Sequence, residues 1–141
     1  MGSHRYESRW ATSIPPENID IRAIALEARD NLPEPLRSDT MHIKIEVTDF
    51  PCEELGETLG LETPFDLLGI FEGSGRKRYW TPRTTSSKTE TLTLFRRAIL
   101  DYWAENRESL GEVVSHIVAN ELGHHYGLND REIGDIEYLL N

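Results

Sequence analysis

Cysteine is almost absent from this 141-residue chain: Cys52 stands alone and cannot form an internal disulfide. Basic residues are also scarce, because 15 lysines and arginines face 25 aspartates and glutamates, for a formal net charge of −10. Nucleic acids and anionic membranes bind basic surfaces, so this charge argues against both as partners. The sequence has no apolar run of membrane-spanning length and no apolar core of a secretory signal. It therefore predicts a cytoplasmic protein.

The length and the hydrophobic content of 38% fit one globular domain. Residues 1–16 are polar around Pro15-Pro16 and are predicted to form an extended N-terminal arm, whose first four residues are typical of an expression-tag remnant. Residues 17–141 are predicted to form the domain. No feature of the sequence sets an oligomeric state.

Hydrophobic periodicity predicts a helix over residues 17–31 and a strand over 41–48. In that strand Met41 is expected to face the core and His42 to be exposed. Strands are also predicted over 67–72, where Gly69 indicates a bulge or a close backbone approach, and over 91–97. Residues 98–103 are expected to form a turn or a short helix, and the acidic, turn-rich stretch 51–66 a solvated surface.

Two capping boxes predict the last two helices, 110–126 and 130–140. Ser109 precedes Glu112 by three residues, and Asn129 precedes Glu132 in the same way. Between the strands, residues 73–90 are rich in Gly, Ser and Thr and are predicted to be the most mobile internal segment. Their basic triplet, residues 76–78, is interpreted as balancing a local acidic surface, with recognition of an acidic group as the alternative.

The helix 110–126 ends in a spaced set of polar residues, Asn120, Glu121, His124, Gly127 and Asp130. Zinc hydrolases carry His-Glu-x-x-His on a helix, with a Gly and a third ligand following at three-residue steps in the extended form. Positions 120 and 124 lie about 40° and about 6 Å apart on a helix, so both side chains can reach one ion. Gly127 can end the helix and let Asp130 return to the same point.

A plainer interpretation of the same residues stays open. Asn120, Glu121 and His124 fall within or beside the apolar arc of the helix, where unpaired polar groups are costly to bury. They could simply be satisfied hydrogen-bonding residues. Gly127 would then be an ordinary C-cap, and Asp130 an acidic residue in the first turn of the next helix.

The order of elements and the motif resemble the small zincin-like metallopeptidase family of bacteria, whose members carry His-Glu-x-x-His-His-Phe-Gly-x-x-Asp near the C-terminus. The segments 65–73 and 91–97 are also similar to the family. The resemblance implies an α+β fold: a minimal zincin-like core in which a small mixed β-sheet packs on an active-site helix, followed by a short C-terminal helix. It also implies a hydrolase that cleaves a peptide or protein substrate, held along an edge strand.

The chain departs from this family pattern at one metal ligand, because Asn120 stands where the first His is expected. The predicted zinc ligands are thus Asn120, His124 and Asp130, with Glu121 as general base. An amide oxygen is a weaker zinc ligand than imidazole, so zinc is expected to be weakly bound or absent. His116 does not easily replace the missing ligand, and it could instead hydrogen-bond Asn120 from the preceding turn. Two hypotheses follow: a zinc-dependent metallopeptidase, weakened or inactive, or a non-catalytic module that binds peptides or proteins on a degenerate zincin scaffold.

Overall fold

The structure is a computed structural model and describes residues 14–73 and 90–140. Its centre is a three-stranded mixed sheet in the order β1-β3-β2. Strand β1 (Lys44–Thr48) runs parallel to β3 (Thr91–Phe95), and β2 (Gly69–Glu72) runs antiparallel to β3. The predicted small mixed sheet of an α+β fold is therefore confirmed.

Alternation along the strands gives the sheet one buried face and one polar face. Ile45, Leu92 and Phe71 lie side by side across the three strands and are 5% exposed or less. On the other face Lys44 and Glu46 form an ion pair of 2.8 Å. The buried face must be covered by other elements, because an apolar sheet face is stable only against a second layer.

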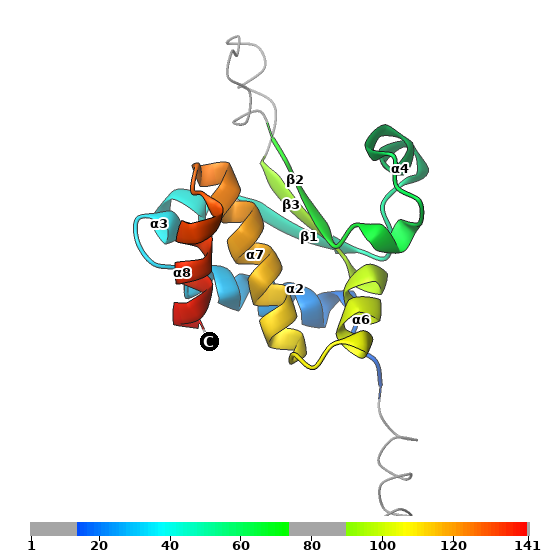
Figure 1. The fold of residues 1–141 in the computed structure, drawn as a ribbon, viewed down its shortest axis with the longest axis horizontal. Helices are drawn as coiled ribbons and strands as arrows, with labels where there is room; N and C mark the ends of the chain where they lie inside the picture. Colours follow the sequence, from blue (N-terminus) through cyan, green and yellow to red (C-terminus); the bar gives the residue numbers. More distant parts are fainter. Residues whose placement is uncertain (1–13, 74–89, 141) are drawn as a thin grey trace, which may run out of the picture.

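Helices α2 (Asn18–Asp30) and α7 (Leu110–Tyr126) supply that second layer. Figure 1 shows both helices, and α8 (Asp130–Leu140) beside α7, on one side of the sheet. These three helices match the predictions for 17–31, 110–126 and 130–140 closely. Their shared core contacts come from apolar residues at helical spacing: Ile21, Ala25 and Ala28 on α2, and Val114, Val118 and Leu122 on α7.

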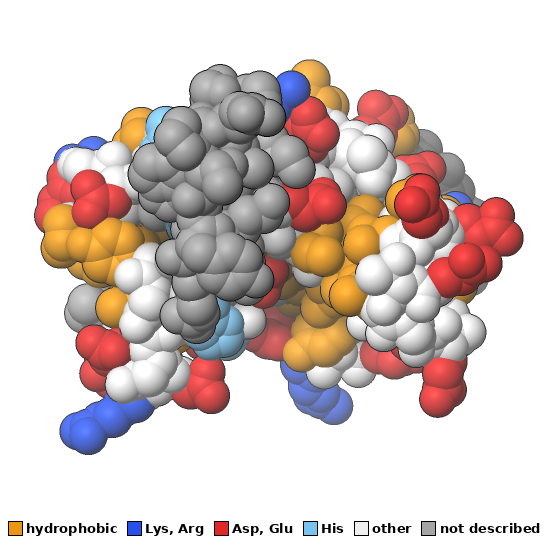
Figure 2. Space-filling model, turned by 90° about the horizontal axis from the view of Figure 1, so that it is seen from above, with side chains coloured by type: hydrophobic (Ala, Val, Ile, Leu, Met, Phe, Trp, Pro, Cys, Tyr) orange, Lys and Arg blue, Asp and Glu red, His pale blue; other side chains and the backbone are white. Residues whose placement is uncertain are grey.

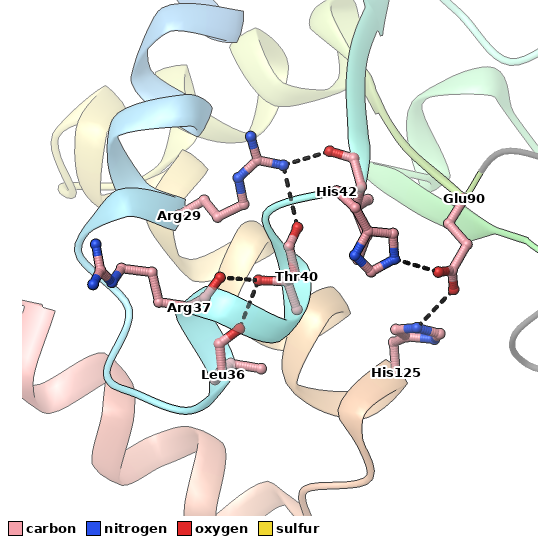
Figure 3. A network of polar contacts seen from close by, with 8 residues as sticks. Arg29, Leu36, Arg37, Thr40, His42, Glu90 and His125 are labelled. Atoms are coloured by element: carbon pink, nitrogen blue, oxygen red, sulfur yellow. Dashed lines mark hydrogen bonds and ion pairs between the residues drawn. The ribbon is translucent and has the colours of Figure 1, made fainter.

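Strand β1 is shorter than predicted, because helix α3 (Leu36–Thr40) is followed by a turn over residues 41–43 and the strand begins only at Lys44. Met41 caps α3 and is 47% exposed, so its predicted place in the core is wrong. Arg29 explains the change. Its buried guanidinium donates to the backbone oxygens of Thr40 and Ile43 and so holds the end of α3 against α2. Figure 3 shows Arg29 reaching Thr40.

Strand β3 is also shorter than predicted, since it ends at Phe95 and helix α6 (Arg96–Glu105) follows without a loop. The prediction of strand for residues 96 and 97 is wrong. Arg96 turns back to the N-terminal segment, where its Nε donates to the oxygen of Pro16 at 2.7 Å. The expected turn or short helix at 98–103 is the middle of α6.

The acidic stretch 51–66 contains helix α4 (Glu53–Leu59) and the short 3-10 helix η1 (Pro64–Asp66), which the turn-rich composition did not predict. None of their residues is buried, which agrees with the predicted solvated surface. Most of the predicted loop 73–90, with its basic triplet, and most of the N-terminal arm lie outside the described residues. Among the described helices, none has the length and apolar character needed to cross a membrane.

Candidate metal and catalytic site

The site is built on α7, whose two ends are fixed by local interactions. At the start, the Ser109 hydroxyl accepts from the backbone N–H of Glu112 at 3.1 Å, and the Glu112 carboxylate accepts from the backbone N–H of Ser109 at 2.9 Å. That backbone hydrogen bond lowers the pKa of Glu112. The predicted capping box is thus present, and it sets where the motif residues fall along the helix.

The end of α7 turns sharply at Gly127, which has a left-handed φ of 103°. The backbone N–H groups of Gly127 and Leu128 both donate to the oxygen of Gly123, at 3.1 and 2.9 Å. These bonds satisfy carbonyl groups that would otherwise be left without partners at the helix end. The predicted positive φ of Gly127 is confirmed, and the chain leaves α7 in a direction that returns it to the last helical turn.

This turn brings Asp130 back to His124. Oδ1 of Asp130 lies 2.9 Å from Nε2 of His124, and both side chains are exposed, at 95% and 43%. Asp130 is also the first residue of α8, so the plainer interpretation of its position describes the backbone correctly. The contact with His124 shows, in addition, that the two strongest predicted metal donors converge.

Asn120 and Glu121 lie one turn earlier on α7, where both are half-buried and line a cleft of about 440 Å³. The residues of other elements that line this cleft lie on β2, on α6, in the segment just before β2 and in the segment just before α7. Positions 120 and 124 share one helix face. Of the predicted site residues, Asn120 and Glu121 therefore lie beside the cleft, and His124 lies in the last turn of α7, where Asp130 of α8 meets it.

The prediction for His116 is wrong, because carboxylates engage both nitrogens of its ring. Its Nε2 lies 2.6 Å from Glu137 on α8, and its Nδ1 lies 3.6 Å from Glu108. His116 therefore links α7 to α8 and to the segment that precedes α7. Asn120 is not its hydrogen-bonding partner.

A polar network that the sequence did not reveal ties the last turn of α7 to the sheet. Glu90, just before β3, contacts Nε2 of His42 at 2.5 Å with one oxygen and Nε2 of His125 at 2.9 Å with the other. His125 also stacks on Phe71, with ring centroids 4.0 Å apart. Figure 3 shows the three side chains meeting from separate elements. Consecutive helix residues project about 100° apart, so fixing His125 on the sheet turns His124 away from it, toward Asp130.

Comparison with known proteins identifies a family for this chain. A family model described as a zincin-like metallopeptidase matches residues 40–139, which is most of the chain. The chain belongs to the zincin-like metallopeptidase family. No curated protein matches the chain at a significant level.

The zincin-like site of this chain is a partial fit for zinc. His124 and Asp130 are donor types that zinc takes readily, and they are already in contact. Asn120 offers only a neutral amide oxygen. Among residues 14–73 and 90–140, no three His, Cys, Asp or Glu side chains are grouped so that they could hold a metal. The predicted donor set would therefore offer zinc two donors that it takes readily and one weak donor.

We expect Gly127→Ala to lower the free energy of unfolding by about 1 kcal/mol or more, since a φ of 103° strains any residue with a Cβ. Gly134→Ala is the matched control. It lies in the middle of α8, where an added Cβ meets nothing within 4 Å, so it should be neutral or stabilising. Urea denaturation measures both. A Gly127→Ala chain as stable as the native one would show that the turn to Asp130 is not strained in this way.

Proposed function

We propose that this chain is a zinc-dependent peptidase whose affinity for zinc is reduced by Asn120. The contact between His124 and Asp130 carries the proposal, because two zinc-type donors meet between α7 and α8, within the segment that the family model matches. The cleft beside Glu121 supports it by providing space for a peptide or protein substrate next to this pair.

In this proposal the residues of α7 and α8 have separate chemical roles. His124 and Asp130 would hold zinc, with Asn120 as the weak third ligand. When bound, zinc would polarise the peptide carbonyl and make a water molecule more acidic. Glu121 would accept the proton of the attacking water and pass it to the leaving amine, as a general base and then a general acid. The anchoring of His125 by Glu90 would keep the imidazole of His124 turned toward Asp130.

The second candidate is a module that binds peptides without cleaving them. Asn120 favours it, because a catalytic zinc site usually has three good protein ligands and a water. The two candidates share the fold and the cleft. They differ in whether the native chain binds zinc at His124 and Asp130.

A thermal test separates the candidates in the native chain. A ligand that binds only the folded state raises the melting temperature, and the rise grows with ligand concentration. We expect zinc to raise the melting temperature of the native chain, and Asp130→Asn to remove this effect. Asp135→Asn, the same change on an exposed residue of the same helix, should keep it.

The outcomes of this test are distinct. A zinc effect lost in Asp130→Asn but retained in Asp135→Asn supports the peptidase proposal. A native chain that zinc does not stabilise at any concentration, or a zinc effect that survives Asp130→Asn, would leave the binding module as the better account.

A further inference from the structure

The cleft beside Glu121 is lined by both acidic and apolar side chains. Among the described residues, no lysine or arginine lines it. Its lining includes three carboxylates and three aliphatic side chains. The carboxylates are those of Asp66, Glu108 and Glu121, and the aliphatic residues are Leu68, Val113 and Ile117.

Glu108 is a carboxylate of this cleft whose contacts leave it available to a positively charged ligand. It lies just before α7, it is about one-third exposed, and its two contacts within the structure are long: 3.5 Å to the Tyr102 hydroxyl and 3.6 Å to His116. His116 has a closer carboxylate partner in Glu137, at 2.6 Å. Asp66, by contrast, already accepts a hydrogen bond from the backbone N–H of Thr63 at 3.0 Å.

The cleft runs along α7 beside the start of β2. An added Cβ on Gly69 would lie 3.2 Å from Ile117, so strand and helix approach closely there. From Val113 to Glu121 the helix rises about 12 Å, the length of three or four residues of an extended peptide. If a peptide lies in this cleft, as the proposed function requires, its cleaved bond would lie beside Glu121. A side chain about three residues from that bond would then reach the end of the cleft where Glu108 lies.

We propose that this end of the cleft is a subsite for a lysine or arginine side chain of an extended peptide, and that Glu108 recognises its charge. The aliphatic stem of such a side chain would pack beside Tyr102, which lines the cleft and is 39% exposed, and its charged end would meet the carboxylate. The net charge of −10 would attract basic peptides to the cleft. Figure 2 shows acidic side chains spread over one face of the molecule beside clustered hydrophobic ones.

Peptide binding without added metal tests the subsite separately from catalysis. Two fluorescent, unstructured peptides would be compared by anisotropy at low salt, one with a single lysine and the other with glutamine in its place. We expect the lysine peptide to bind the native chain about 5- to 10-fold more tightly. Glu108→Gln should reduce this preference to less than about 2-fold, whereas Glu27→Gln, the same charge change on an exposed residue of α2, should retain it.

Charge reversal provides a second variant. Glu108→Lys should favour a peptide with glutamate at the variable position over the lysine peptide, provided that melting confirms that the variant is folded. Equal binding of both peptides to the native chain would overturn the subsite, as would a lysine preference that survives Glu108→Gln. Cleavage of peptides without any lysine preference would refute the subsite alone. A lysine preference in a chain that never cleaves would support the subsite and contradict the proposed activity.

Discussion

Asn120→His should tighten zinc binding by more than about 100-fold. The native donor set has one imidazole, one carboxylate and one amide, and the substitution would turn it into two imidazoles and one carboxylate, with a position left for water. Loss of a residue that only supports a metal ligand typically changes zinc affinity by about 10- to 100-fold. A direct ligand should have a larger effect. The new imidazole would stand one turn before His124 on the same helix face, so no movement of the backbone is required.

Calorimetric titration of zinc into both chains would measure this change, and a larger zinc-dependent rise in melting temperature should accompany it. Asn106→His is the matched control, because it makes the same substitution at an exposed position after α6. It should leave zinc affinity close to that of the native chain. If Asn120→His and the native chain bound zinc equally, position 120 would not face the metal, and the binding-module account would be preferred.

Glu121→Gln, added to Asn120→His, should lower peptide cleavage by about 10²- to 10⁴-fold, the usual contribution of a positioned general base. Glutamine keeps the shape of the side chain but cannot accept the proton. Since Glu121 is not among the proposed ligands, zinc affinity should change by less than about 3-fold. Single-turnover cleavage of an unstructured peptide and zinc titration would be measured on the same preparations.

The control for the Glu121→Gln change is Glu27→Gln, also added to Asn120→His. This control chain should cleave peptide as fast as the Asn120→His chain. Equal loss of zinc and of cleavage in the Glu121→Gln chain would make Glu121 a ligand and not a base. Undiminished cleavage would remove Glu121 from the chemistry altogether.

The sequence predicted α7 closely because every signal for it is local. Ser109 and Glu112 mark its start, apolar residues at helical spacing mark its buried face, and Gly127 marks its end. The strand boundaries were less predictable. Helix α3 is held by Arg29, whose hydrogen bonds reach residues 11 and 14 positions away. No turn residue separates β3 from α6, so nothing in the pattern showed that the strand stops at Phe95.

The same difference between local signals and contacts of distant residues applies to the site. His124 and Asp130 are six residues apart across one turn, so the motif spacing alone suggested that they meet. The partners of Glu90 lie 48 and 35 positions away along the chain, at His42 and His125. The register of the sheet and the packing of α7 bring these side chains together, and no single-sequence pattern encodes that encounter. For the same reason, the link from His116 to Glu137 on α8 was missed.

Anomalous diffraction at the zinc edge, from crystals of the native chain grown with zinc, tests the central claim most directly. We expect one strong peak between Nε2 of His124 and the carboxylate of Asp130, on the Asn120 side of the helix end. Zinc found only away from this turn, or no peak within reach of His124, would contradict the claim that this turn is the metal site of the chain.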